Sequence, residues 1–132
     1  MSLHSWPKHH GLERIDFVDK HWAPEDFNIL EVWGDPETGM LYYGEDHGCY
    51  CCQSPFDGQK REDLVLIDDI KVFARTAREW AMNNYHPNTK VITKLGAMMI
   101  RIRTFEERFD IVFDAAELIE SLDDEPALND EN

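Results

Sequence analysis

Basic residues are scarce in this chain of 132 residues, in which 13 lysines and arginines face 27 aspartates and glutamates. The net charge of −14 disfavours non-specific binding to nucleic acid or to an anionic membrane, because both are negatively charged themselves. Long apolar runs are missing as well, and none approaches the roughly 20 residues that cross a bilayer. We therefore expect no direct nucleic-acid partner and no membrane partner.

The sequence motifs that mark common enzyme classes are absent. The chain contains no G-x-x-x-x-G-K-[ST], no G-x-G-x-x-G, no H-E-x-x-H and no G-x-S-x-G. The paired H-x-E and P-C-x-x-C of the zinc deaminases are missing too. We expect a protein that is not an enzyme, with no catalytic residue and no cofactor.

Cysteine is rare, and its three copies lie within four positions. An extracellular disulfide framework would use spaced and usually even cysteines. A bridge between Cys49 and Cys51, or between Cys51 and Cys52, would be strained by the short separation. The first ten residues also lack the pattern of a signal or transit peptide. We expect reduced thiols in a cytoplasmic protein.

Three short segments have the character of β-strands. Residues 13–18 alternate between apolar and charged side chains, which is the period of a strand. Residues 27–33 are rich in aromatic and β-branched residues. Residues 40–44 follow them after a Gly-Asp-Pro-Glu-Thr-Gly segment that has the composition of a turn. The last two segments therefore predict a β-hairpin.

A first helix is predicted from residue 63 onward, because apolar residues recur there three and four positions apart. Asp68 or Asp69 could cap its start. The residue before Pro87 resists the helical conformation, so the helix should end before it.

A second helix is predicted over residues 88–122, where apolar residues alternate at spacings of four and three without interruption. A short strand over residues 98–103 is the competing interpretation. We call the alternating residues the seam: Val91, Leu95, Met98, Ile102, Phe105, Phe109, Val112, Ala116 and Ile119.

The order of these elements, strands first and helices after, predicts an α+β fold. We expect a small antiparallel three-stranded sheet with two helices packed on it, or three helices if the second breaks near Thr104. Residues 1–11 should form a flexible N-terminal arm and residues 12–122 a single α+β domain. Residues 123–132 should form an acidic disordered tail.

The loop after the third predicted strand contains four residues of metal-ligating type: His47, Cys49, Cys51 and Cys52. A structural zinc site takes four ligands, usually in two separated pairs, and so short a segment can hardly wrap around one ion. A distant histidine, namely His9, His10, His21 or His86, would have to complete the site. Zinc is thus a candidate metal for this loop, although no residue spacing in the sequence requires a metal site.

The same loop also fits a structural interpretation. Gly48 and Pro55 would bend the chain, Phe56 would anchor the exit, and the thiols would pack beneath the loop as buried cysteines commonly do. A nucleophilic cysteine fits less well, because the acidic neighbours of the loop would raise the pKa of a thiol.

The seam has two interpretations. It could be core, buried under the sheet and the first helix. However, a helix of about 33 residues would be about 50 Å long, which exceeds what a three-stranded sheet covers. Either the helix breaks near Thr104, or an exposed apolar length needs a second copy of the chain or another protein. The candidates for such partner binding are Met98, Ile102, Phe105 and Phe109.

Residues 40–57, MLYYGEDHGCYCCQSPFD, resemble a motif of small uncharacterised proteins from actinobacteria and their phages. The motif has an aromatic strand, Gly-Cys-x-Cys, Ser-Pro-Phe with an acid, and then Asp-Leu, which Asp63 and Leu64 match. One extra residue separates the first cysteine from Pro55, so either Cys51 or Cys52 corresponds to the second cysteine of the motif. The resemblance implies a small phage or actinobacterial protein, and the family has no established activity or catalytic residue to carry over.

Three hypotheses for function follow. The first is a phage-encoded, non-enzymatic protein that binds a host or phage protein, or itself, in the host cytoplasm. The second is a metal- or thiol-dependent module centred on His47, Cys49, Cys51 and Cys52. The third is an acidic DNA mimic, because residues 114–132 contain eight acids and no lysine or arginine.

Overall fold

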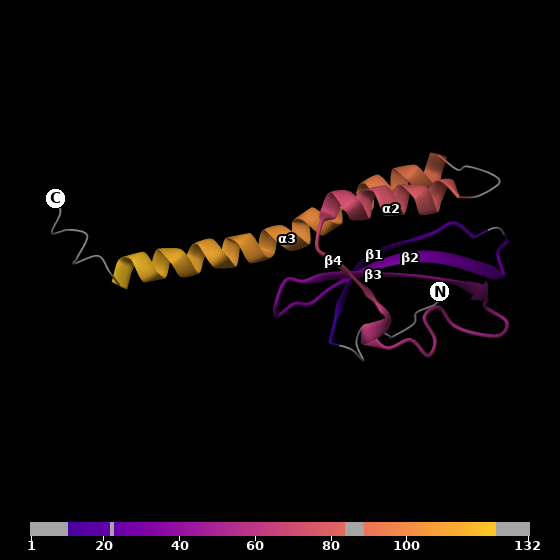
Figure 1. Ribbon diagram of the computed structural model, residues 1–132, viewed down its shortest axis with the longest axis horizontal. Helices are drawn as coiled ribbons and strands as arrows, with labels where there is room; N and C mark the ends of the chain where they lie inside the picture. The colour runs from indigo at the N-terminus through magenta and orange to yellow at the C-terminus, as the bar shows by residue number, and fades with distance from the viewer. Residues whose placement is uncertain (1–10, 22, 84–88, 124–132) are drawn as a thin grey trace.

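The computed structural model describes residues 11–21, 23–83 and 89–123, and for residues 110–123 it describes the course of the backbone. Four antiparallel strands form one sheet in the order β1-β2-β3-β4, and two helices cover one of its faces (Figure 1). The predicted α+β class is confirmed. The elements are β1 (Glu13–Asp19), β2 (Asp26–Gly34), β3 (Leu41–Cys49), the 3-10 turn η1 (Arg61–Asp63), β4 (Val65–Ile67), α2 (Ile70–Met82) and α3 (Thr89–Asp123).

The sheet has one strand more than the three that were predicted. Residues Val65–Ile67, assigned above to the first helix, pair with Leu41, Tyr42 and Tyr43 on β3. The helix starts later because Asp69 caps it: its carboxylate accepts hydrogen bonds from the backbone N–H groups of Lys71 at 2.9 Å and Val72 at 3.4 Å. Asp69 is therefore the cap, and Asp68 is not.

Strand β3 is longer than the predicted residues 40–44. It pairs with β2 along its whole length, from Leu41 opposite Gly34 to Cys49 opposite Asp26. His47, predicted to lie in a loop, lies on this strand. Pairing with β2 outweighs the poor strand propensity of a segment that contains Gly, Asp and His.

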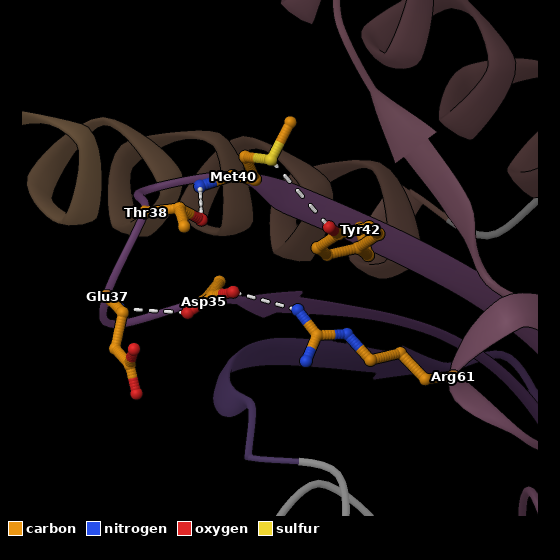
Figure 2. A network of polar contacts seen from close by, with 6 residues as sticks. All are labelled: Asp35, Glu37, Thr38, Met40, Tyr42 and Arg61. Atoms are coloured by element: carbon orange, nitrogen blue, oxygen red, sulfur yellow. Dashed lines mark hydrogen bonds and ion pairs between the residues drawn. The ribbon is translucent and has the colours of Figure 1, made fainter.

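The turn between β2 and β3 is fixed by hydrogen bonds, and Figure 2 shows its polar contacts. The N–H of Gly39, whose φ is +81°, donates to the carbonyl of Asp35 at 2.8 Å. One carboxylate oxygen of Asp35 accepts from the N–H of Glu37 at 2.9 Å, and the other pairs with Arg61 at 2.8 Å. Together these contacts lower the pKa of Asp35, and Arg61 ties the segment after the cysteine loop to the hairpin.

Strand β2 is buried on both faces of the sheet. Leu30 and Val32 face the helices and join a core with residues from α2 and α3. Phe27, Ile29 and Trp33 belong to a second cluster, with Leu12, Phe56 and Leu64. In Figure 1 the segment from the end of β3 to η1 lies on the side of the sheet away from the helices.

Helix α3 is a single unbroken helix of 35 residues. Both the competing strand over residues 98–103 and a break near Thr104 are therefore wrong. The helix crosses the sheet beside α2 and then continues well beyond it (Figure 1). The predicted arm, apart from Gly11, and the predicted tail, apart from Asp123, lie outside the described residues.

Candidate functional site

The cysteine loop, residues 49–56, begins where β3 ends. The backbone carbonyl of Cys49 accepts two N–H groups, from Cys52 at 3.1 Å and from Gln53 at 3.2 Å, which closes a tight turn. Tyr50 N–H donates to the carbonyl of Glu25 at 2.9 Å, so the turn is tied to the start of β2. The turn is therefore held by backbone hydrogen bonds on both sides.

Phe56 anchors the exit of the loop, as predicted. Its side chain is fully buried and meets the ring of Trp33 edge-on, with ring centroids 5.0 Å apart. The backbone of Phe56 has a φ of +63°, which non-glycine residues seldom adopt. Its N–H donates to Asp46 at 2.7 Å, and this bond with the burial of the ring holds the residue in that conformation.

The thiols do not pack beneath the loop, so the buried-thiol interpretation is wrong. Cys51 and Cys52 are exposed and Cys49 is half-buried, because Phe56 fills the space under the loop instead. The sulfurs of Cys51 and Cys52 lie 3.1 Å apart. Hydrogen bonds with the sulfurs of Cys49 and Cys52 raise the pKa of Cys51 to about 11. At neutral pH Cys51 is thus a thiol rather than a nucleophilic thiolate.

The four candidate metal ligands are only partly brought together. His47 is exposed, and its backbone carbonyl accepts the side-chain amide of Gln53 at 3.3 Å. His21 pairs with Asp19 at 3.4 Å, while His9, His10 and His86 lie outside the described residues. Within the described ranges, no group of three or more His, Cys, Asp or Glu side chains is arranged to hold a metal ion.

The seam residues predicted to bind a partner lie against the sheet. Met98, Ile102 and Phe105 are buried in the core with the helix-facing side of the sheet, and Phe109 is half-buried. The rings of Phe105 and Phe109 contact each other at 4.9 Å between centroids. The structure thus assigns the first three side chains to the core, which was the other interpretation of the seam.

Arginines hold α3 to strand β1. Arg108 forms two contacts with the carboxylate of Glu13, at 2.8 and 3.3 Å, and its guanidinium lies 4.9 Å from the centre of the Phe105 ring. Arg101 pairs with Asp16 at 3.6 Å. These pairs lie largely at the surface and contribute little stability individually, and they connect α3 to the edge strand β1.

Glu31 is a buried acid that the sequence analysis did not single out. It is completely buried on β2 and accepts a hydrogen bond from Arg14 at 2.9 Å. Burial raises the pKa of Glu31 to about 7, and Arg14 opposes that rise. The signal for it was available, since Glu31 is the one acid inside the apolar run of residues 27–33.

A second overlooked signal is the spacing of Cys49 and Cys52, which is C-x-x-C. A four-ligand metal site would use all three cysteines alike, so the zinc hypothesis does not distinguish this pair from Cys51. In the structure these two residues are the first and last of the turn that closes on the carbonyl of Cys49.

Comparisons with known proteins give a family and no activity. No curated protein and no solved structure matches the chain significantly. In the described part of the chain, no helix combines the length and apolar character needed to cross a membrane. A family model described as a domain of unknown function, DUF7574, matches residues 1–103, which include the whole sheet, α2 and the first part of α3. The chain therefore belongs to the DUF7574 family.

Proposed function

We propose that the protein is a non-enzymatic interaction module that binds a partner protein through residues 110–123, here called the α3 extension. One observation carries this proposal. The backbone of α3 stays helical to Asp123, 14 residues beyond Phe109, the last residue of the helix that packs against the described core. Figure 1 shows the extension running beyond the sheet and α2.

The composition of the α3 extension supports a role in binding. A helix of about 12–15 residues is marginal in water on its own, and most helices in proteins are stabilised by packing of an apolar face. The extension has that apolar content, and the seam continues through it at the same spacing. Its apolar residues are Ile111, Val112, Phe113, Ala115, Ala116, Leu118, Ile119 and Leu122.

Charge supports one kind of partner. The α3 extension has five acidic residues and no lysine or arginine. Its last turn contains no basic residue, although the negative end of the helix dipole favours positive charge there. A partner that presents a basic amphipathic helix would supply both the apolar face and the missing positive charge. A second copy of the chain would add like charge instead.

The setting follows from the resemblance of residues 40–57 to small proteins of actinobacteria and their phages. In that setting the partner is a host or phage protein. This assignment indicates which cell lysate to use in a search for the partner protein. The peptide experiment described next tests the chemistry of the partner and does not depend on the assignment.

The test uses a synthetic helix with leucine at the seam spacing and lysine or arginine on both flanks. A peptide of the same composition in shuffled order is its control, because it keeps the charge and loses the apolar face. Fluorescence anisotropy should show that the full chain binds the first peptide and not the second. The double variant Val112→Ser/Ile119→Ser should weaken binding by about tenfold or more, since two apolar contacts are lost.

Ile100→Ser is the matched control variant, because Ile100 is 68% exposed and lies on α3 before the extension. It should bind like the unchanged chain. Equal binding of the shuffled peptide, or undiminished binding by the double variant, would contradict the proposal. Light scattering of the chain alone should give a monomer, and a dimer that the double variant dissociates would make a second copy the partner.

A further inference from the structure

The turn at the end of β3 brings the three thiols of the chain together at the surface. We propose that Cys49 and Cys52 form a dithiol pair that undergoes exchange with low-molecular-weight disulfides and closes to an intramolecular disulfide. The site is separate from the α3 extension and does not depend on the proposed partner.

The geometry of the turn favours Cys49 and Cys52 over the other two pairings. Cys52 N–H donates to the Cys49 carbonyl at 3.1 Å, which makes these residues the two ends of a four-residue turn. Such a turn places its terminal Cα atoms less than about 7 Å apart, and disulfides span Cα separations of about 4.4–6.8 Å. Cys51 and Cys52 are adjacent, with Cα atoms about 3.8 Å apart, which is below that range.

Cys51 has a different part in the cluster. Its backbone N–H lies 3.4 Å from the sulfur of Cys49, and its own sulfur lies 3.1 Å from that of Cys52. Contacts with the sulfurs of Cys49 and Cys52 raise the pKa of Cys51 to about 11, so this residue keeps its proton at neutral pH. Exchange is therefore assigned to Cys49 and Cys52, the two ends of the turn, and does not require Cys51.

The exchange proceeds in two balanced steps. The thiolate of Cys52, which is exposed, attacks one sulfur of a disulfide R–S–S–R, forming a Cys52–S–S–R bond and releasing one RS⁻. The thiolate of Cys49 then attacks the sulfur of Cys52, forms the Cys49–Cys52 disulfide and releases the second RS⁻. Two protein thiols are oxidised, the small disulfide is reduced to two thiols, and the protons of the cysteines pass through solvent to the leaving groups.

The frame of the loop allows this change without unfolding. Tyr50 N–H is bonded to Glu25, the side chain of Gln53 to the carbonyl of His47, and Phe56 N–H to Asp46. None of these bonds uses a sulfur atom, so closure of the disulfide leaves all of them in place.

The experiment incubates the reduced full-length chain with cystamine, a cationic disulfide suited to a chain of net charge −14. Titration with a chromogenic thiol reagent should show the three free thiols falling to one, and intact mass should show a monomer that has lost two hydrogens. Peptide mapping should place the disulfide between Cys49 and Cys52. The variant Cys51→Ser should still close the disulfide.

The variants Cys49→Ser and Cys52→Ser should not close a disulfide and should stop at the mixed disulfide with cystamine. Circular dichroism melting of the three reduced variants checks that each is folded. A bond mapped to Cys51, a product that remains a mixed disulfide in the unchanged chain, or a failure of Cys51→Ser to close the disulfide would each overturn the proposal.

Discussion

Gly34 shows how a single missing side chain positions the long helix. A Cβ atom at Gly34 would overlap the ring of Phe105. We expect Gly34→Ala to destabilise the protein by about 1–3 kcal/mol, because the ring must move out of a packed core. Urea unfolding measures this effect. Gly96→Ala is the control, since a Cβ there meets nothing within 4 Å, and it should stabilise α3 by about 1 kcal/mol. Equal effects of the two variants would contradict the packing of Phe105 on the hairpin.

Glu31 makes stability depend on pH. Its pKa is about 7 in the folded chain, compared with 4.5 without burial. Between these values the folded state keeps a proton that the unfolded state has lost, so the free energy of unfolding falls as pH rises, by about 3 kcal/mol in total. Glu31→Gln does not titrate. In chemical unfolding experiments, the free energy of unfolding of Glu31→Gln relative to that of the unchanged chain should therefore increase from pH 4 to pH 8. If the two free energies of unfolding changed with pH in the same way, the prediction would be contradicted.

At the scale of elements, the start of α2 depends on one carboxylate. Asp69→Ala should cost about 1 kcal/mol of stability, because the N–H groups of Lys71 and Val72 lose their acceptor. Asp68→Ala is the matched control, since it removes the same charge one position earlier, from an exposed residue that is not the cap. Thermal unfolding of both variants tests the difference, and an equal loss would mean that charge near the helix start matters more than the cap.

Elements whose apolar pattern repeats over many residues were predictable from the sequence. Elements that are strands only because they pair with a neighbouring strand were not. The seam repeats over enough residues to establish α3, and the alternation in residues 13–18 indicates β1. Val65–Ile67 has three apolar residues and no period, so only its pairing with β3 makes it a strand. For the same reason the sequence predicts a loop at the end of β3, where the structure has a strand that pairs with β2.

The candidate site followed the same rule. Crowding of the cysteines identified the loop, and the anchoring role of Phe56 was predictable from its position after Pro55. The exposure of the thiols was not predictable from the sequence. It depends on Phe56, which fills the space next to Trp33 on the face of the sheet opposite the helices. The burial of Glu31 depends in the same way on which side chains cover that face.

At the scale of the whole molecule, charge and core are unevenly distributed along the chain. Deleting residues 110–132 removes nine acidic residues and no basic one, which brings the net charge from −14 to −5. The deletion leaves the whole sheet, α2 and both buried clusters described above in the chain. The shortened chain should therefore keep its fold. It should melt at the same or a higher temperature than the full chain at low ionic strength, because charge repulsion within the molecule decreases.

Salt separates this electrostatic effect from packing. In about 1 M salt, where the Debye length is about 3 Å, the two melting temperatures should converge. Deletion of residues 124–132 alone is the control, because it removes four acids and leaves α3 whole, so it should give a smaller rise at low salt. A lower melting temperature for the longer deletion at both salt concentrations would show that the α3 extension packs on its own domain. The extension would then be unavailable to a partner.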